Sequence, residues 1–359
     1  MTRSLQNVTL ESTAMGFVFL LGLLGNTLIF CAIRRNPRLR TISNMFVFGL
    51  AVSDILMSAL CMPLSLITLI HGQWIFGGMV CQAHGFFVFT LGLTSLHMMA
   101  LVSINRYFCI LKPSKYQSLF KKRRTILLIF IVWVDALVGS IPPLFFNFGG
   151  YSFQPGKVMC LYEFEKNIPY TVFIEVVFIG TPLCVIALCY TFVFKEVNRT
   201  NKVFVNDELS PEELRAHVKE AKVTKRLAAV FLGFACCWIP VSVIDYIDAI
   251  NGSPLLTRHI YLAYGFLVYI SSLINPIIYG IASRSFRHEY KRMFRSIVCY
   301  PLCCSKPVTS IWELCLQRID VNTKDRATYS TILILSVVEK PLKNNKYKER
   351  CYLFALGCI

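Results

Sequence analysis

Long apolar segments separated by short polar connections run through most of the chain. Windows of about 20 residues, the length that crosses the hydrocarbon core of a bilayer, pick out spans at 12–33, 44–70, 79–110, 124–146, 169–194, 223–247 and 259–281. In lipid each span must be a helix, because an unpaired backbone amide has no water to bind. The short alternating segments of a membrane β-barrel do not occur in the sequence. The pattern therefore predicts an all-α membrane protein whose residues 12–283 form a seven-transmembrane helix bundle.

Lysine and arginine residues gather in alternate connections between these spans. They are frequent in residues 34–40, 112–124 and 219–226, whereas "HGQWIFGG" between the second and third spans has none. Basic connections stay on the cytoplasmic side, so the sequence predicts a multi-pass plasma-membrane protein with an extracellular N-terminal segment, residues 1–11. The net charge of +17 then mostly reflects this topology. Nucleic acid is not expected as a partner, because no solvated basic domain is visible.

The first span is expected to remain in the protein as a helix. It is long, lacks a basic segment before it and ends in "RRNPRLR", which does not fit a cleavable signal peptide. Ahead of it, Asn7-Val8-Thr9 is a glycosylation sequon on the predicted extracellular side. A similar triplet at Asn198 falls on the predicted cytoplasmic side, so the motif alone is a weak signal. Asn7 is the predicted glycosylation site.

Two cysteines differ in position from the others. Most of the 15 cysteines fall in apolar spans or on the predicted cytoplasmic side, where a small buried hydrophobe or a reduced thiol is expected. Cys81 opens the third span and Cys160 lies in the second extracellular connection, both in the oxidising compartment. We predict a disulfide between them that pins this connection over the third span.

Polar residues inside the spans are costly in lipid and must face protein or trapped water. Asp54 lies midway along the second span. Residues at matching depths are Asn26, Ser95, Ser271, Ser272 and Asn275. Such a cluster positions helices against one another. It also offers Asp54 as the site of a sodium ion or a proton, and both interpretations can hold at once.

Two prolines interrupt the hydrogen bonding of the last two spans. Pro240 in "CCWIP" and Pro276 in "NPIIY" each remove one intrahelical hydrogen bond and favour a kink, which offers a hinge. Trp238, two residues before Pro240, would place its ring at the base of an outward-facing cavity. The alternative is a buried aromatic that only packs.

The order and spacing of several motifs are those of one receptor family. They are Gly25-Asn26, "LAVSD" ending at Asp54, Cys81, "NRY" at 105–107, Trp133, Cys160, Pro182 with Tyr190, "CWIP" at 237–240 and "NPIIY" at 275–279. On these motifs the chain resembles rhodopsin-like (class A) G-protein-coupled receptors over residues 12–296. The resemblance implies a receptor that transduces an extracellular ligand into activation of a heterotrimeric G protein.

The resemblance also implies roles for individual residues. In such receptors the cytoplasmic end of the sixth helix swings outward, and the arginine matching Arg106 lies at the floor of the crevice that meets the G protein. The residues assigned to coupling and activation are Asn105, Arg106, Tyr107, Tyr190, Trp238, Pro240, Asn275, Pro276 and Tyr279. Family members usually carry an acidic residue where Asn105 stands, so we expect a weaker resting restraint and higher basal signalling. Taken alone, Arg106 would be interpreted as an interfacial cation whose charge reaches the headgroups, but the full set of motifs favours the receptor role.

The ligand class is narrowed by positions that differ from known subgroups. An opsin-like chain would have the retinal lysine where Tyr269 stands, so no covalent retinal and no other cofactor is expected beyond a possible sodium ion. An aminergic receptor would have aspartate at Val88. The nearest subgroup is the melatonin receptors, although Phe178, Pro143 and Pro276 depart from their pattern. We predict a melatonin-like or orphan ligand and a G protein of the inhibitory class. The alternatives are a receptor for a peptide or another small molecule, and, less favoured, a non-retinal relative of the opsins.

The expected ligand cavity is lined by residues in the outer halves of the spans. The candidates are Val88, Phe89, Glu175, Phe178, Trp238, Val241, Asp245 and Tyr269. Glu175 lies well inside an apolar stretch, where an ionisable group either engages a basic or donor group of the ligand or stays protonated in a hydrogen bond. Pairing with another helix is the structural alternative. His97 and Asp135 are expected to pair across the third and fourth spans.

The segment after the last span predicts an amphipathic helix over residues 284–296. Phe286, Tyr290 and Phe294 share one face, so the helix is expected along the inner leaflet with its basic residues toward anionic lipid headgroups. Cys299, Cys303 and Cys304 follow and are candidates for palmitoylation, with plain reduced cysteines as the alternative. Residues 297–359 are predicted to be a cytoplasmic tail.

Other membrane-protein classes fit the sequence less well. A transporter would favour internal repeats, a channel a selectivity filter or charged ring, and an enzyme a convergent catalytic set; none is recognisable in the sequence. We therefore expect no enzymatic activity and no metal site other than sodium at Asp54.

Overall fold

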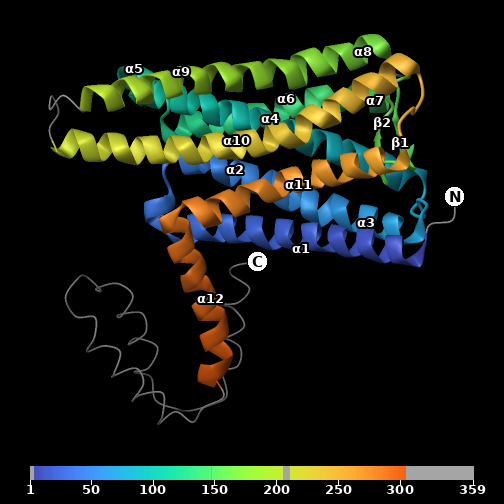
Figure 1. The fold of residues 1–359 in the computed structure, drawn as a ribbon, viewed down its shortest axis with the longest axis horizontal. Coiled ribbons are helices and arrows are strands. Elements are labelled where there is room, and N and C mark those ends of the chain that lie inside the picture. The colour runs from blue at the N-terminus through green and yellow to red at the C-terminus, as the bar shows by residue number, and fades with distance from the viewer. Residues whose placement is uncertain (1–3, 147, 205–210, 305–359) are drawn as a thin grey trace. The chain divides into compact units, whose positions relative to one another are not determined.

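The computed structural model describes residues 4–146, 148–204 and 211–304. In this part of the chain, seven helical stretches are long and apolar enough to cross a membrane, and Figure 1 shows them running side by side. They are α1 (Leu5–Arg35); α2 (Ile42–Leu56) continued by a π-helical segment (Met57–Cys61) and α3 (Met62–His71); α4 (Gly78–Leu111); α6 (Lys122–Ser140) with α7 (Pro142–Phe145); α8 (Ile168–Phe173) continued by a π-helical segment (Ile174–Gly180) and α9 (Thr181–Phe204); α10 (Pro211–Asn251); and α11 (Arg258–Ala282). This confirms the predicted seven-helix bundle. The short helix α5 (Pro113–Leu119) lies between α4 and α6.

The first helix begins earlier than the apolar pattern predicts. Ser4 caps α1, because its Oγ accepts a hydrogen bond from the Asn7 amide at 3.3 Å. Glu11 then forms a bidentate ion pair with Arg258 at the start of α11, with distances of 2.8 and 2.5 Å. The segment expected as an extracellular N-terminus is thus helical from Leu5, and the sequon at Asn7 lies in the first turns of α1.

One helix occupies the centre of the bundle. In the apolar window of α4, 83% is buried, compared with 22% for the window of α6 and α7. On α6 the large apolar side chains Ile126, Leu127, Phe130, Val134 and Val138 are exposed. A helix surface of this kind suits lipid rather than water. The bundle therefore buries α4 and turns apolar faces outward.

Each of the two π-helical segments is followed by a proline, which has no backbone N–H to donate. Met57–Cys61 leads into α3 with Pro63 in its first turn, and Ile174–Gly180 leads into α9 with Pro182 in its first turn. The sequence analysis did not predict these segments. A π-helical turn changes the face of the helix on which the following residues lie. Such turns recur at functional sites. Pro240 and Pro276, by contrast, lie inside continuous helices, α10 and α11.

The connection between α7 and α8 folds into a hairpin, which the sequence analysis did not predict. Strands β1 (Tyr151–Gln154) and β2 (Met159–Tyr162) pair antiparallel, with Phe153 opposite Cys160. Cys160 is bonded to Cys81 at the start of α4, which confirms the predicted disulfide. All four residues of β2 are buried. The hairpin is therefore part of the core at this end of the bundle, which we call the hairpin end (Figure 1).

The chain forms two compact units, Met1–His288 and Glu289–Ile359. Helix α12, Arg284–Cys304, spans the boundary between them and is longer than the amphipathic helix predicted for 284–296. Its apolar positions at helical spacing include Phe294, which is exposed. The side chains of Cys299, Cys303 and Cys304, and the tail beyond residue 304, lie outside the described residues.

Candidate functional site

Arg106 is buried near the end of α4 opposite the hairpin end, with 3% of its surface exposed. Its Nη2 donates to the Asn105 side-chain oxygen at 3.0 Å and also to Ser43 Oγ of α2. Ser43 Oγ in turn donates to the same Asn105 oxygen at 3.3 Å. The guanidinium thus meets a neutral amide where a carboxylate would give a charge-assisted pair, which is the stronger interaction.

Three tyrosines surround this end of the bundle in different ways. Tyr190 of α9 is buried and stacks on Phe231 of α10 with ring centroids 5.9 Å apart. It lies within electrostatic range of both Arg106 and Tyr279. Tyr279 of α11 is buried as well, against Phe286. Tyr107 is only half-buried and packs edge-on against neighbouring phenylalanines. Two of the three therefore share the interior with Arg106.

Asp54 is the centre of a buried polar network. Its Oδ2 accepts from Asn275 Nδ2 at 2.7 Å and its Oδ1 from Ser95 Oγ at 3.4 Å. Ser53, which the sequence analysis overlooked, is 3.1 Å from Ser95 through the two hydroxyl groups. The side-chain nitrogen of Asn26 joins this network by donating a hydrogen bond to the Ser272 carbonyl oxygen at 2.8 Å. The Ser271 hydroxyl instead donates to the Val268 carbonyl oxygen of its own helix.

The oxygen atoms around Asp54 suit a hard monovalent cation. The side-chain oxygens of Asn26 and Asn275 are buried without a hydrogen-bond partner among the described residues. Together with a carboxylate and serine hydroxyls they form a set of oxygen donors, the ligand type that hard cations prefer. The residues present therefore fit a sodium ion at Asp54. Within the described ranges, no group of three or more His, Cys, Asp and Glu residues suits another metal.

Trp238 of α10 packs between neighbouring helices of the bundle. Its ring stacks on Phe234 with centroids 5.6 Å apart, and its Nε1 has no hydrogen-bond partner among the described residues. Gly92 of α4 makes room for the ring, since a Cβ there would come within 2.6 Å of it. The tryptophan is thus closely packed on α4 and keeps a buried donor without an acceptor.

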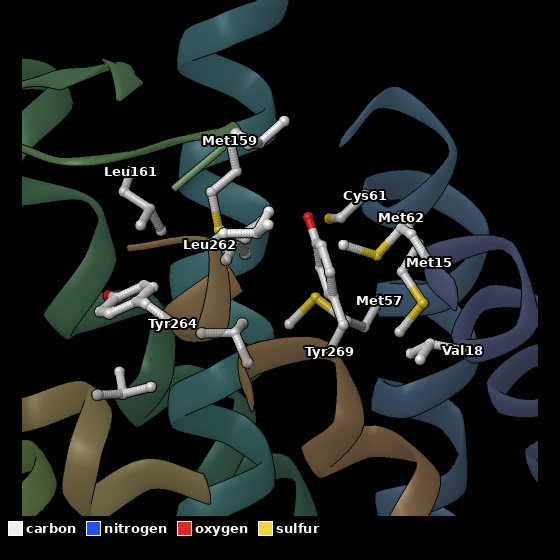
Figure 2. Close-up of a cluster of buried hydrophobic side chains, with 14 of the residues drawn as sticks. Met15, Val18, Met57, Cys61, Met62, Met159, Leu161, Leu262, Tyr264 and Tyr269 are labelled. Carbon is white, nitrogen blue, oxygen red and sulfur yellow. The ribbon is translucent and has the colours of Figure 1, made fainter. Parts of the chain in front are cut away.

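The apolar ligand candidates pack against the hairpin. Val88, Val241 and Tyr269 belong to one buried cluster that also contains Met159 and Leu161 of β2. Figure 2 shows Met159 and Leu161 reaching in from the hairpin toward Tyr264, with Tyr269 between them and the methionines Met57 and Met62. Phe89 faces the hairpin tyrosines Tyr151 and Tyr162. The hairpin therefore fills the outer part of the expected cavity with its own side chains.

Tyr269 occupies the position at which an opsin carries its lysine. Its ring is fully buried and its hydroxyl is 2.7 Å from Ser65 Oγ of α3, which also contacts His84. A phenol held in this way offers no amine for a Schiff base. The residues present therefore do not fit covalent retinal.

His97 and Asp135 pair as predicted, with His97 Nδ1 2.8 Å from a carboxylate oxygen. The other ring nitrogen of His97, Nε2, is 2.9 Å from the Phe178 carbonyl and must donate to it. Phe178 is thus tied to α4 through its backbone, while its ring packs on Phe173 and His97. The Asp135 contact links α4 to α6, and the hydrogen bond from Nε2 links α4 to the π-helical segment that contains Phe178.

The two carboxylates proposed to line the cavity have different surroundings. Asp245 of α10 has both oxygens engaged, by Lys157 Nζ at 2.9 Å and by the Tyr264 hydroxyl at 2.8 Å. It therefore serves an internal ion pair that the sequence analysis missed. Glu175 is buried, lies within electrostatic range of Asp245 and Ser242, and its Oε1 has no hydrogen-bond partner among the described residues. Glu175 is the stronger ligand candidate.

Seven membrane-length helices, an arginine buried at one end and a disulfide-pinned hairpin at the other define a seven-helix membrane receptor. A family model described as 7 transmembrane receptor (rhodopsin family) matches residues 25–279. The chain belongs to this family. It is accordingly a multi-pass receptor of the plasma membrane that responds to a ligand and couples to a G protein.

Several known proteins are similar to the chain along most of its length. Melatonin receptor type 1A-A of Danio rerio is 28% identical over 305 residues, which cover 82% of this chain and 85% of that protein. Melatonin receptor type 1B of Rattus norvegicus is 28% identical over 299 residues, covering 82% and 78%. A GQ-coupled rhodopsin of Mizuhopecten yessoensis is 31% identical over 301 residues, covering 81% of this chain and 59% of that protein. The crystal structure of squid rhodopsin has a TM-score of 0.73 at 22% identity and covers 91% of this chain and 94% of that chain, which supports the fold.

Proposed function

We propose that this receptor has its N-terminus outside the cell, binds its ligand beneath the hairpin and activates a G protein of the inhibitory class around Arg106. The observation that carries the proposal is the separation of two buried polar groups at opposite ends of one bundle. Glu175 lies near the hairpin end, and its Oε1 has no hydrogen-bond partner in the described part of the chain. Arg106 lies at the other end and donates a hydrogen bond to the neutral side chain of Asn105. A ligand that engages one end and a G protein that engages the other are then coupled by the helices between them.

Helix α10 is the element suited to transmit the change. It carries Trp238 and Pro240 in its middle, Asp245 near the hairpin and Phe231 against Tyr190 on the other side. Pro240 removes a backbone hydrogen bond at this point, so the helix bends there at lower cost than elsewhere. Displacing Trp238 moves the helix below it and releases Phe231 from Tyr190. Tyr190 and Tyr279 then support Arg106 against the G protein.

The ligand anchor in this proposal is Glu175. A buried acceptor with an open oxygen favours a ligand that brings a donor or a cation, because leaving such a group unpaired costs free energy. Trp238 Nε1 adds an open donor. The similarity to melatonin receptors favours a melatonin-like or an as yet unassigned small molecule, and a peptide or another small molecule is the alternative.

The sodium ion and the covalent modifications are parts of the same proposal. Sodium is proposed at Asp54, where it would hold the resting arrangement of α2, α4 and α11. Glycosylation is proposed at Asn7, and palmitoylation at the cysteines that end α12. An inner-leaflet position for residues 284–296 is proposed from their amphipathic sequence.

Nucleotide exchange on purified G-protein α subunits tests the coupling. The wild-type receptor is combined with inhibitory-class and Gq-class subunits, in light and in darkness, with amine, indole and peptide ligands. We expect ligand-dependent exchange on the inhibitory class that is the same in light and in darkness. Exchange on Gq alone would contradict the class, and failure of every ligand and subunit would contradict the receptor proposal.

The orientation is tested separately by an epitope placed ahead of Leu5. It should be detected by antibody on intact cells. Detection only after permeabilisation would invert the topology and remove Glu175 from the extracellular side.

A photoreceptor is the second candidate, because the GQ-coupled rhodopsin of Mizuhopecten yessoensis is among the similar proteins. Tyr269 stands where the Schiff-base lysine would be needed. We therefore expect no visible absorption band after incubation with 11-cis-retinal. A stable band in the visible would favour this second candidate.

A further inference from the structure

A lysine of the hairpin is buried in a cage of acidic and aromatic side chains. Lys157 lies in the turn between β1 and β2 and is 3% exposed. Its Nζ is 2.9 Å from Asp245 and 3.3 Å from Asp248, both of α10. The same nitrogen lies 4.3 Å from the ring centroid of Tyr264, in the range of a cation–π contact, and 5.7 Å from that of Tyr261. We call Asp245, Asp248, Tyr261 and Tyr264 the ammonium cage.

The cage does not depend on Lys157 for its shape. The second oxygen of Asp245 accepts from the Tyr264 hydroxyl at 2.8 Å, and the second oxygen of Asp248 accepts from the Tyr261 hydroxyl. Both tyrosines belong to α11, so each carboxylate of α10 is also held by a hydrogen bond that does not involve the lysine. Removing the lysine side chain would leave these buried carboxylates without their cation, a costly state that favours binding of another cation.

The backbone of the turn is brought unusually close to α11. A Cβ on Gly265 would lie 2.6 Å from the Lys157 carbonyl oxygen, and a Cβ on Gly156 would lie 2.9 Å from Tyr261. Val158, directly after the lysine, has φ of 58°, a conformation that a β-branched residue rarely adopts. With Cys160 tied to α4, this geometry presents the lysine side chain to the cage. The Lys157 side chain therefore occupies the cage as a ligand would, and the hairpin backbone attaches it to the receptor.

The cage and its surroundings contain more carboxyl groups than the single ammonium group of Lys157 can pair with. Glu175 lies within electrostatic range of Asp245, is buried, and has one oxygen without a hydrogen-bond partner among the described residues. Two buried carboxylates thus contact the ammonium group, and a third buried carboxyl group lies near one of them. This region favours cations over anions or neutral molecules.

We propose that the ammonium cage is a binding site for a primary ammonium group, that Lys157 is its tethered occupant, and that external aliphatic amines compete with the hairpin for it. An amine-bearing ligand reaches the cage when the hairpin turn withdraws from Gly265. The site lies between α10 and α11, apart from the helix-three position at which an aminergic receptor carries its aspartate and this chain has Val88. The proposal rests on the proposed function only for its effect on signalling.

The test uses the purified full-length receptor without a G protein, so its failure leaves the coupling proposal intact. Lys157→Ala empties the cage, and n-butylamine, which resembles the lost side chain, is titrated at neutral pH and constant ionic strength while the thermal unfolding midpoint is followed. We expect a saturable rise of about 2 °C or more in Lys157→Ala, since a ligand that binds only the folded state stabilises it. n-Butanol should give no such rise, because it lacks the charge.

Two controls locate the effect. Lys166→Ala removes a lysine of the same connection whose side chain is exposed and paired with Glu163 at 2.7 Å. It should behave as wild type, which responds only at much higher n-butylamine concentrations because Lys157 competes for the cage. Lys157→Ala combined with Asp245→Asn and Asp248→Asn should lose the response. No saturable rise in Lys157→Ala, or an equal rise in all proteins, overturns the proposal.

A second variant is prepared because Lys157→Ala leaves two buried carboxylates unpaired, which can prevent folding. If Lys157→Ala is not recovered folded, Lys157→Ala with Asp248→Asn is titrated instead, because one carboxylate then remains. It should show a saturable rise with n-butylamine and none with n-butanol. Absence of any saturable response in this variant contradicts the proposal.

Discussion

Arg106 donates a hydrogen bond to the side-chain oxygen of the residue directly before it, Asn105, at 3.0 Å. The acceptor is a neutral amide shared with Ser43, so the guanidinium has no carboxylate in this contact. A hydrogen bond between two charged groups is stronger than one to a neutral group. The contact therefore restrains Arg106 less than a carboxylate at position 105 would.

Restoring a carboxylate should lower basal activity. Asn105→Asp should strengthen the restraint on Arg106 by about 1 kcal/mol and reduce ligand-independent nucleotide exchange about fivefold. Asn105→Ala is the matched control and should leave basal exchange the same or higher. Equal basal exchange in Asn105→Asp and wild type would contradict this account of the resting state.

The ligand anchor is tested by replacing its carboxyl group with an amide of the same shape. Glu175→Gln should weaken agonist potency about tenfold or more, because a hydrogen bond to a charged group contributes roughly 1.5–3 kcal/mol. Glu163→Gln, in the extracellular connection, serves as the control and should keep full potency. Dose–response curves of nucleotide exchange give the comparison, and unchanged potency in Glu175→Gln would remove it from the ligand site.

The network around Asp54 should respond to sodium and not to potassium. Replacing KCl by NaCl at constant ionic strength should raise the thermal unfolding midpoint of the wild-type receptor, since a cation bound only by the folded state stabilises it. Asp54→Asn keeps the hydrogen-bonding shape and should abolish the difference. Thermal unfolding by intrinsic fluorescence measures it, and a sodium effect that persists in Asp54→Asn would place the ion elsewhere.

The ion pair in the ammonium cage predicts a loss of stability at alkaline pH. Burial alone would lower the pKa of Lys157, but the charges and hydrogen bonds of Asp245 and Asp248 outweigh it and raise the pKa above the ordinary value of 10.5. A group whose pKa is raised on folding stabilises the folded state below its unfolded pKa and loses that contribution as the pH rises through the folded value. The contribution of Lys157 should thus be constant at neutral pH and decline above about pH 10.5.

The measurement compares unfolding midpoints of wild type and Lys157→Met across this pH range. The difference between the two proteins should be steady from neutral pH upward and then shrink in the alkaline window. Comparing the two removes the titration of other lysines and tyrosines. A difference that shrinks already near neutral pH would mean that the ammonium is poorly paired.

The fold followed from the sequence because its signals are local. Apolar length predicts a membrane helix wherever it occurs, and the compartment of Cys81 and Cys160 was enough to predict their disulfide. Depth along the spans likewise predicted the pairing of Asp54 with Ser95 and Asn275 and that of His97 with Asp135. Each of these needs only the position of a residue along its own helix.

The features that the sequence left out depend on contacts between distant segments. Lys157 and Asp245 are 88 residues apart, and they meet only because the hairpin turns inward past Gly265. Because the hairpin was not predicted, Lys157 could not be distinguished from the other loop lysines. Asp245 was predicted to line the ligand cavity. The early start of α1 at Leu5 was missed for a related reason, since its polar first turns are stabilised by the Glu11–Arg258 ion pair rather than by lipid.

The central claim is that Arg106 is where this receptor acts on a G protein. The most direct measurement is nucleotide exchange on a purified inhibitory-class α subunit with wild type and with Arg106→Ala, matched for unfolding midpoint. The account predicts faster exchange with wild type and loss of that acceleration with Arg106→Ala. Equal acceleration by both proteins would contradict it.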